Sequence, residues 1–265
     1  MKTNLYIFIL IAIFATSCEK VITVDLNEAN PQIVVSSRID FMEGDQKGTP
    51  WVNLHWTASV YETEKLKVID NAVVKVIDMD GNSSTLSYIG YGFYSGLRVK
   101  KGKIGDQYKL QIEVDGKTIT SENSLSRSVK IDSLTYALDG FGPHQGDGYT
   151  VTCHFTDPAN EINYYYLKIS INGENQQGYF ITRDDGLDGK TISYAFFRNP
   201  ISSASNVSVE LYTLDEAAFE YFKVLAMMEQ GGMSTAPGNP PSNIQGDAIG
   251  LFFVANMDMK NIQIP

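Results

Sequence analysis

One cysteine near the N-terminus has the surroundings that lipid modification requires. An apolar run at residues 5–14 follows Lys2, and three small residues, 15–17, stand directly before Cys18. This order is typical of an export signal peptide, and the apolar run is too short to cross a bilayer as a helix. The Cys18 thiolate would take a diacylglyceryl group, and cleavage would free its amine for a further acyl chain such as palmitate. We therefore predict a lipoprotein signal peptide at residues 1–17 and lipidation at Cys18.

The residue three positions before Cys18 is Ala15 rather than the usual leucine, so an ordinary signal peptide with an incidental cysteine stays an alternative. At about 0.8 kcal/mol per buried methylene, two or three acyl chains would anchor the protein without a transmembrane helix. Removal of residues 1–17, which hold Lys2, would leave 248 residues with 20 Lys and Arg against 31 Asp and Glu, a formal net charge of −11. That acidity argues against nucleic-acid binding and against a polybasic membrane patch.

Three aspartates in one short segment, Asp184, Asp185 and Asp188, are the metal candidates of this sequence. Calcium takes several hard oxygen ligands, which such a cluster could supply. The segment lacks the alternating ligands and distal glutamate of an EF-hand loop. Asp-Gly pairs are also ordinary turn residues. A calcium site and a solvated turn are therefore both open, and we expect no other cofactor.

The residues that catalysis would need are dispersed. His55, His144 and His154 show no metal-ligand spacing, and the nucleophile-elbow, phosphate-binding and dinucleotide-binding glycine motifs are absent. Cys153 lies in an alternating segment, where a lone cysteine is expected as a small core residue. A chain with 31 acidic residues could still hold the paired carboxylates of a glycosidase. We predict no catalytic residues and a protein that is not an enzyme.

Aromatic residues are the candidates for ligand contact, in particular Tyr94, Phe141 and Tyr165. Tyrosine combines an apolar body with a hydrogen-bonding tip, which suits sugar and protein surfaces. Along a strand, Tyr164 and Tyr166 would share one face and Tyr165 would take the other. The alternative is that these rings fill the core or the outer surface of a sandwich.

The elements that must position these residues are mainly strands, because apolar and polar residues alternate in many short segments. Turn residues such as Asp80-Gly81 and Asp115-Gly116 separate the segments, and a Ser-rich stretch at 121–128 reads as a boundary. The predicted strands are 33–39, 52–61, 72–78, 84–88, 107–114, 117–120, 131–138, 149–155, 164–172, 178–182, 191–197, 207–214 and 248–254.

One helix is predicted at about residues 214–230. Thr213 and Glu216 form a capping-box pattern, apolar residues recur at helical spacing, and Gly231-Gly232 would end the helix. A proline-containing loop at residues 231–246 follows, and its length is typical of either a functional or a mobile loop.

Several segments taken together resemble the domain of unknown function 4249 family, bacterial lipoproteins often encoded beside TonB-dependent outer-membrane receptors. The segments are Cys18-Glu19-Lys20-Val21-Ile22, Asn71-Ala72-Val73-Val74-Lys75-Val76, Gly105-Asp106-Gln107-Tyr108-Lys109-Leu110, Phe155-Thr156-Asp157-Pro158 and Glu220-Tyr221-Phe222. Part of this pattern is similar to immunoglobulin-like, carboxypeptidase-regulatory-like sandwiches. The resemblance implies no catalytic residues.

The resulting expectation is a mainly β fold in two parts after a tether at residues 18–30. Residues 31–125 would form the immunoglobulin-like sandwich, and residues 126–265 a second β-rich domain with the helix. The expected function is a non-enzymatic lipoprotein of the outer membrane that assists a TonB-dependent receptor or uptake system. A glycan-binding or glycan-cleaving lipoprotein and a structural or adhesive surface subunit are the alternatives. Glu19 is followed by Lys20 and Val21 rather than by an acidic run, so the membrane face stays open.

Overall fold

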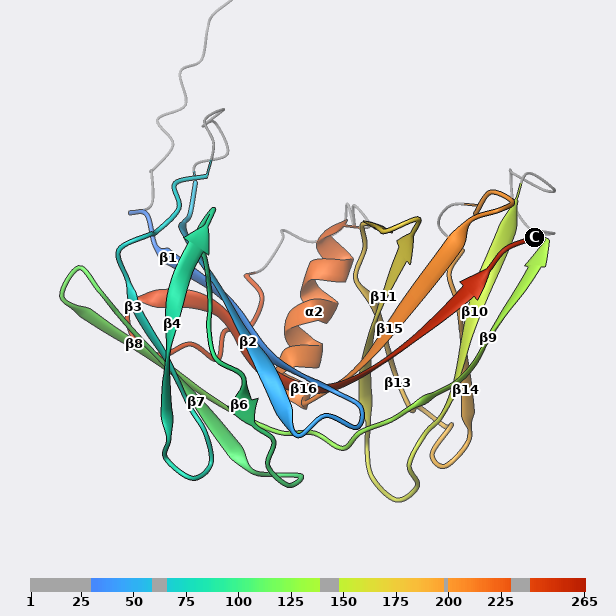
Figure 1. Cartoon of the computed structure of the whole chain (residues 1–265), viewed down its shortest axis with the longest axis horizontal. Coiled ribbons are helices and arrows are strands. Elements are labelled where there is room, and N and C mark those ends of the chain that lie inside the picture. Colours follow the sequence, from blue (N-terminus) through green and yellow to red (C-terminus); the bar gives the residue numbers. More distant parts are fainter. Residues whose placement is uncertain (1–29, 59–65, 139–147, 198–199, 230–238) are drawn as a thin grey trace, which may run out of the picture. The chain divides into compact units, whose positions relative to one another are not determined.

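The computed structural model describes residues 30–58, 66–138, 148–197, 200–229 and 239–265 (Figure 1). The predicted signal peptide, Cys18, nearly all of the tether, Phe141 and His144 lie outside these residues. Within them the protein is mainly β with one helix, as the alternation predicted. Residues 31–265 form one compact unit.

The strands follow one another as β1 (Ile33–Met42), β2 (Lys47–Trp56), β3 (Val73–Ile77), β4 (Ser83–Gly90), β5 (Phe93–Ser95), β6 (Val99–Lys100), β7 (Gln107–Val114), β8 (Lys117–Ser124), β9 (Ile131–Leu138), β10 (Tyr149–Thr156), β11 (Tyr164–Ile171), β12 (Glu174–Asn175), β13 (Phe180–Arg183), β14 (Thr191–Ala195), β15 (Asn206–Leu214) and β16 (Ala248–Gln263). The helix, α2, spans Glu216–Glu229. The Ser-rich stretch that we expected to be a boundary is therefore strand up to Ser124.

A large sheet runs in the order β12-β11-β15-β16-β1-β2-β5-β4-β3-β7-β8. Its N-terminal half folds over, since the ring of Phe41 on β1 lies 5.5 Å from the ring of Tyr108 on β7, several strands away. Alternation along β1 directs Val35 and Ile39 into the core between the two layers, where both are fully buried. The result is the predicted sandwich arrangement.

A second core lies between the other half of the large sheet and a three-stranded sheet in the order β14-β10-β9. Phe155 of β10 packs edge-on against Tyr165 of β11, with ring centroids 4.7 Å apart. Cys153 is fully buried in the same core, as predicted.

The last strand joins both halves. β16 continues to Gln263, well past the predicted end at Val254, because its second part pairs with β15 while its first part pairs in parallel with β1. Phe252 and Val254 belong to the first core, whereas Ile262 packs against the second. The division at residues 125 and 126 stays a prediction.

Helix α2 begins one residue after its cap, Asp215. The Asp215 carboxylate accepts a hydrogen bond from the backbone N–H of Ala218 at 2.9 Å, which satisfies one of the free donors of the first turn. The predicted capping box was wrong. Thr213 lies in β15, where its hydroxyl donates to the backbone carbonyl of Asn256 at 3.4 Å. None of the helices described is both long and apolar enough to cross a membrane.

Candidate functional site

A groove of about 460 Å³ lies between α2 and one face of the large sheet. Figure 1 shows α2 with β1 and β2 on one side and β11 and β15 on the other, while β16 crosses beneath it from one side to the other. Many of the groove's lining residues are aromatic: Trp51, Phe93, Tyr166, Tyr179, Tyr221, Phe222 and Phe253. We call it the α2 groove.

Strand alternation explains its composition. Val35 and Ile39 of β1 point into the first core, so Ser36 and Arg38 face the other way and form part of the floor. Strand register then places Arg38 between Trp51 of β2 and Phe253 of β16. On the wall, the ring of Tyr166 stacks on Phe222 of α2, with centroids 4.6 Å apart and an angle of 14° between the rings.

Two cations from different strands meet in the floor. The Nε of Arg38 donates to Oδ2 of Asp40 at 2.7 Å. Lys168 of β11 stands opposite Glu210 of β15, and its Nζ lies 3.9 Å from Glu210 Oε2 and 4.7 Å from the centroid of the Tyr212 ring. Arg38 and Lys168 line the groove, whereas neither Asp40 nor Glu210 does. The groove therefore presents positive groups, with their counter-charges set outside its lining.

Burial alters the titration of this cluster. It raises the pKa of the Asp40 carboxyl, although the neighbouring Arg38 opposes that shift. It lowers the pKa of the Lys168 ammonium, and the nearby charge of Arg38 lowers it further. One carboxylate oxygen of Asp40, Oδ1, is buried and has no hydrogen-bond partner among the described residues. Each cation therefore has one carboxylate beside it, Asp40 for Arg38 and Glu210 for Lys168, and the positive groups alone lie in the lining of the groove.

The predicted aspartate cluster is only partly brought together. Carboxylate oxygens of Asp184, Asp188 and Asp157 lie within 4.8 Å of one another. Asp185 instead forms an ion pair with Arg183, and Asp157, the residue directly after β10, takes its place. Sequence reasoning missed Asp157 because nearly thirty residues separate it from the cluster.

Protein donors already engage two of these carboxylates. Asp157 accepts hydrogen bonds from the Tyr165 hydroxyl and from the N–H of Gly189, and Asp188 accepts one from the N–H of Asn160 at 2.7 Å. Burial and the nearby charge of Asp157 raise the pKa of the Asp184 carboxyl. Three carboxylates could supply part of the six to eight oxygen ligands that calcium takes. The calcium site stays a prediction.

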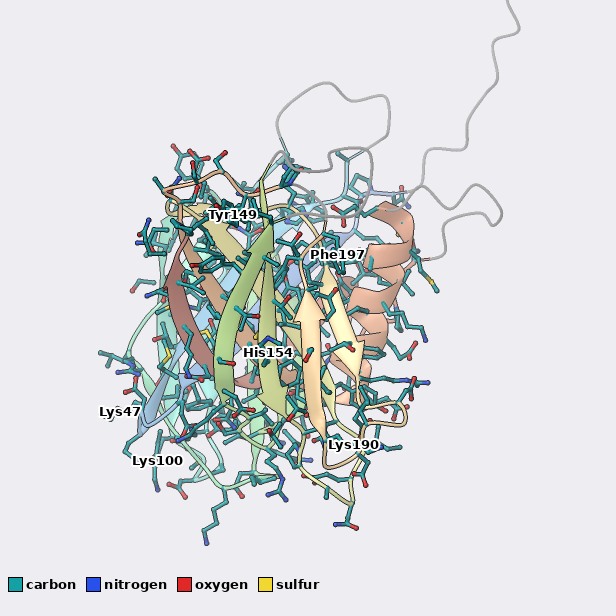
Figure 2. All side chains as sticks on the ribbon, turned by 90° about the vertical axis from the view of Figure 1, so that its right-hand side faces the viewer. Lys47, Lys100, Tyr149, His154, Lys190 and Phe197 are labelled. Carbon is teal, nitrogen blue, oxygen red and sulfur yellow. The ribbon has the colours of Figure 1, made fainter. Side chains whose placement is uncertain are left out.

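The histidines remain separate. His154 lies about midway along the exposed face of the three-stranded sheet (Figure 2), where its ring nitrogens are each 2.8 Å from a hydroxyl, of Thr135 and of Ser193. His55 lines the α2 groove and contacts the Asn53 side chain at 3.2 Å.

Two of the three aromatic ligand candidates, Tyr94 and Tyr165, lie in the core, and the third, Phe141, is outside the described residues. Tyr94 is only 1% exposed, and its hydroxyl donates to the carbonyl of Ile69 at 3.0 Å and accepts from the N–H of Ala72. Tyr165 is fully buried against Phe155. Neither can therefore contact a ligand. The prediction that Tyr165 faces away from its two neighbours was correct, but the groove uses the opposite face, with Tyr166.

Two solved structures show a distant likeness to this chain. A DUF4785 family protein from Legionella pneumophila is 11% identical, with a TM-score of 0.27, over 69% of this chain and 51% of its own. The FN1–FN3 domains of chicken CNTN1 are 8% identical, with a TM-score of 0.24, over 70% of this chain and 62% of theirs. The match thus spans about half to three-fifths of those chains. No curated protein matches the sequence.

A family model, by contrast, matches residues 19–261, which is nearly the whole chain. The protein therefore belongs to the family described as domain of unknown function (DUF4249).

Proposed function

We propose that the protein is a non-enzymatic, lipid-anchored component of the outer membrane that binds its ligand in the α2 groove. It would act as an accessory of a TonB-dependent receptor or uptake system. The observation that carries the proposal is the groove itself. Its volume of about 460 Å³, aromatic walls and few polar groups are typical of small-molecule sites.

The anchor is supported by the sequence around Cys18, where small residues separate the apolar run from a cysteine. The receptor partner is supported by the resemblance to lipoproteins encoded beside TonB-dependent receptors. The groove supports a binding role, since its polar side chains include a guanidinium and an ammonium group that suit the recognition of charge.

A glycan-binding lipoprotein is the second candidate. The observation that favours it is the set of rings at the groove, including Trp51 and Tyr179, because aromatic faces suit the apolar faces of sugars. Glycan cleavage is a less suitable role for this groove. It would need a pair of carboxylates, and Asp40 and Glu210 lie beside the cations Arg38 and Lys168.

The anchor is tested by metabolic labelling with radioactive palmitate and by membrane fractionation. We compare the wild type with Cys18→Ala and with a chain whose residues 1–18 are replaced by an ordinary cleavable signal peptide. The third form controls for an uncleaved signal peptide, which would hold Cys18→Ala at the membrane. Only the wild type should incorporate label, and the third form should be released. Equal release of the wild type and the third form would rule out the lipid anchor.

The partner is tested by affinity purification of the tagged wild type from envelope membranes after crosslinking. Recovery of a TonB-dependent receptor with the wild type, and its loss with the released form, is the expected outcome. A membrane-bound wild type that recovers no such receptor would contradict the accessory role, and glycan arrays would then test the second candidate.

A further inference from the structure

We propose that the α2 groove selects an amphipathic organic anion, in which a carboxylate is attached to an apolar or aromatic body and is bound by Arg38. This inference rests on the proposed binding role of the groove and names the ligand class. It follows from three features: the free donors of Arg38, the distribution of charge around the groove, and the chemistry of the walls.

Arg38 has donors to spare. A guanidinium carries five N–H groups in a fixed fork. Within the described chain, the hydrogen bond of the Arg38 side chain is the one from Nε to Asp40, which leaves the terminal N–H groups available. The side chain is 35% exposed and lines the groove. A fork held by one fixed bond is arranged in advance for a planar carboxylate, which it can bind through two parallel hydrogen bonds.

The charge around the groove favours an anion. Arg38 and Lys168 line it together with His55, and none of the aspartates and glutamates in the described part of the chain does. The sequence as a whole has a net charge of −10, so the lining of the groove is positive in a protein that is otherwise acidic. Burial is the main cause that lowers the pKa of Lys168; repulsion from Arg38 acts in the same direction, and Glu210 and Asp40 oppose both. A carboxylate would relieve that repulsion, whereas a neutral sugar or a cation would not.

The rest of the groove suits an apolar body. Trp51 and Phe93 lie on the side of β2 and β5, and Phe222 and Leu225 come from α2. Phe93 is 44% exposed and Tyr179 and Leu225 are partly exposed, so a ligand would remove apolar surface from water. Removal of apolar surface from water favours binding by a free energy of about 25 cal/mol per Å². The groove volume fits a small molecule rather than a folded partner.

The test uses a matched pair of probes, 2-naphthylacetate and 2-naphthylacetamide, which share a body and differ in charge. Titration calorimetry is performed on the mature chain carrying Cys18→Ala, so that no lipid competes for the groove. The carboxylate should bind saturably and about tenfold more tightly than the amide, the difference expected for one charge-assisted hydrogen-bond pair. Equal affinities, or no saturable binding of the carboxylate, would overturn the proposal.

Variants then locate the site. Arg38→Lys keeps the charge but loses the fork, so it should bring the two affinities close together. The matched control, Arg183→Lys, changes an exposed arginine outside the groove and should leave the tenfold preference intact. Ser36→Trp fills the exposed floor without changing any charge and should abolish binding of both probes.

An unchanged preference in Arg38→Lys, or unchanged binding in Ser36→Trp, would overturn the assignment to this groove. Saturable binding of a neutral oligosaccharide in place of the carboxylate would overturn the ligand class and support glycan recognition. These results are independent of the anchor and receptor experiments, because they use a chain without lipid or partner. A failure here is therefore distinguishable from a failure of the envelope role.

Discussion

At the residue scale, burial controls the reactivity of the Cys153 thiol. Burial raises its pKa to about 12, and the charges of Asp258 and Asp132 act in the same direction. The reactive species of cysteine is the thiolate, so the folded protein should be nearly inert to thiol reagents at pH 8. We predict that the mature chain carrying Cys18→Ala reacts with a chromogenic disulfide reagent only as it unfolds. Rapid reaction without denaturant would show that this core opens locally.

The aspartate cluster leads to a second prediction at this scale. Because the pKa of Asp184 is raised in the fold, the native state binds more protons than the unfolded chain just above the ordinary value of 3.8. Stability from this group therefore falls as the pH rises through the raised pKa. Asp184→Asn should raise the melting temperature at pH 7 in the presence of a chelator, and the gain should vanish toward pH 3.

The control for that experiment is Asp185→Asn, which changes an exposed carboxylate outside the cluster. A lower melting temperature for Asp184→Asn at pH 7 would contradict the argument from burial and the nearby charge of Asp157, which together raise the pKa of Asp184. Calcium added to the wild type separates the two interpretations of the cluster. A rise in melting temperature that Asp184→Asn removes would support a metal site, since ligands that bind the native state stabilise it.

At the element scale, the parallel pairing of β1 with β16 depends on Gly250. This residue stands opposite Val35 with φ of +131°, and a Cβ there would lie 1.9 Å from the Val35 carbonyl oxygen. We predict that Gly250→Ala lowers the free energy of unfolding by about 3 kcal/mol or more, because both strain and lost pairing contribute. Urea unfolding followed by circular dichroism measures the change.

The control is Gly116→Ala in the β7–β8 turn, where φ is +74° but nothing lies within 4 Å of an added Cβ. Only the left-handed backbone opposes that substitution, at a cost of about 1–2 kcal/mol. Similar unfolding midpoints for the two variants would contradict the close approach of β1 and β16.

The sequence predicts an element well where nearby residues determine it, and poorly where pairing with a distant strand does. Alternation located β7 and its hairpin partner β8 because side-chain period and the Asp115-Gly116 turn are both local signals. The second part of β16 escaped prediction, since Asp258 and Lys260 read as loop residues until β15 pairs with them. The cap of α2 was misplaced because β15 extends through Leu214 and moves the helix start.

The α2 groove could not be predicted in the same way. Arg38, Trp51, Lys168 and Phe222 come from distant parts of the sequence, and only the parallel pairing of β1 with β16 brings their strands beneath the helix. No local pattern encodes that pairing. The sequence indicated aromatic side chains as ligand contacts. Which tyrosines of β11 are accessible, however, depends on which face of the strand is covered, and that is a property of the folded sheet.

At the scale of the whole molecule, the two cores share one strand. The first core contains Phe252 and Val254 of β16 as well as residues of β1 to β8. The backbone N–H of Val254 also donates to the side chain of Asn123 in β8, at 2.9 Å. A fragment of residues 31–125 would lose these contacts and expose the edge of β1. Loss of one buried phenylalanine costs about 3–5 kcal/mol, a large part of the stability of a small domain.

We therefore predict that residues 31–265 unfold in one cooperative step and that residues 31–125 alone do not fold stably. The chain provides a separate probe for each core. Both tryptophans, Trp51 and Trp56, belong to β2, a strand of the first core, and Cys153 lies in the second core. In urea, tryptophan fluorescence and Cys153 labelling should give coincident transitions. Two separate transitions, with a folded 31–125 fragment, would instead make β16 a strand that docks between two independent domains.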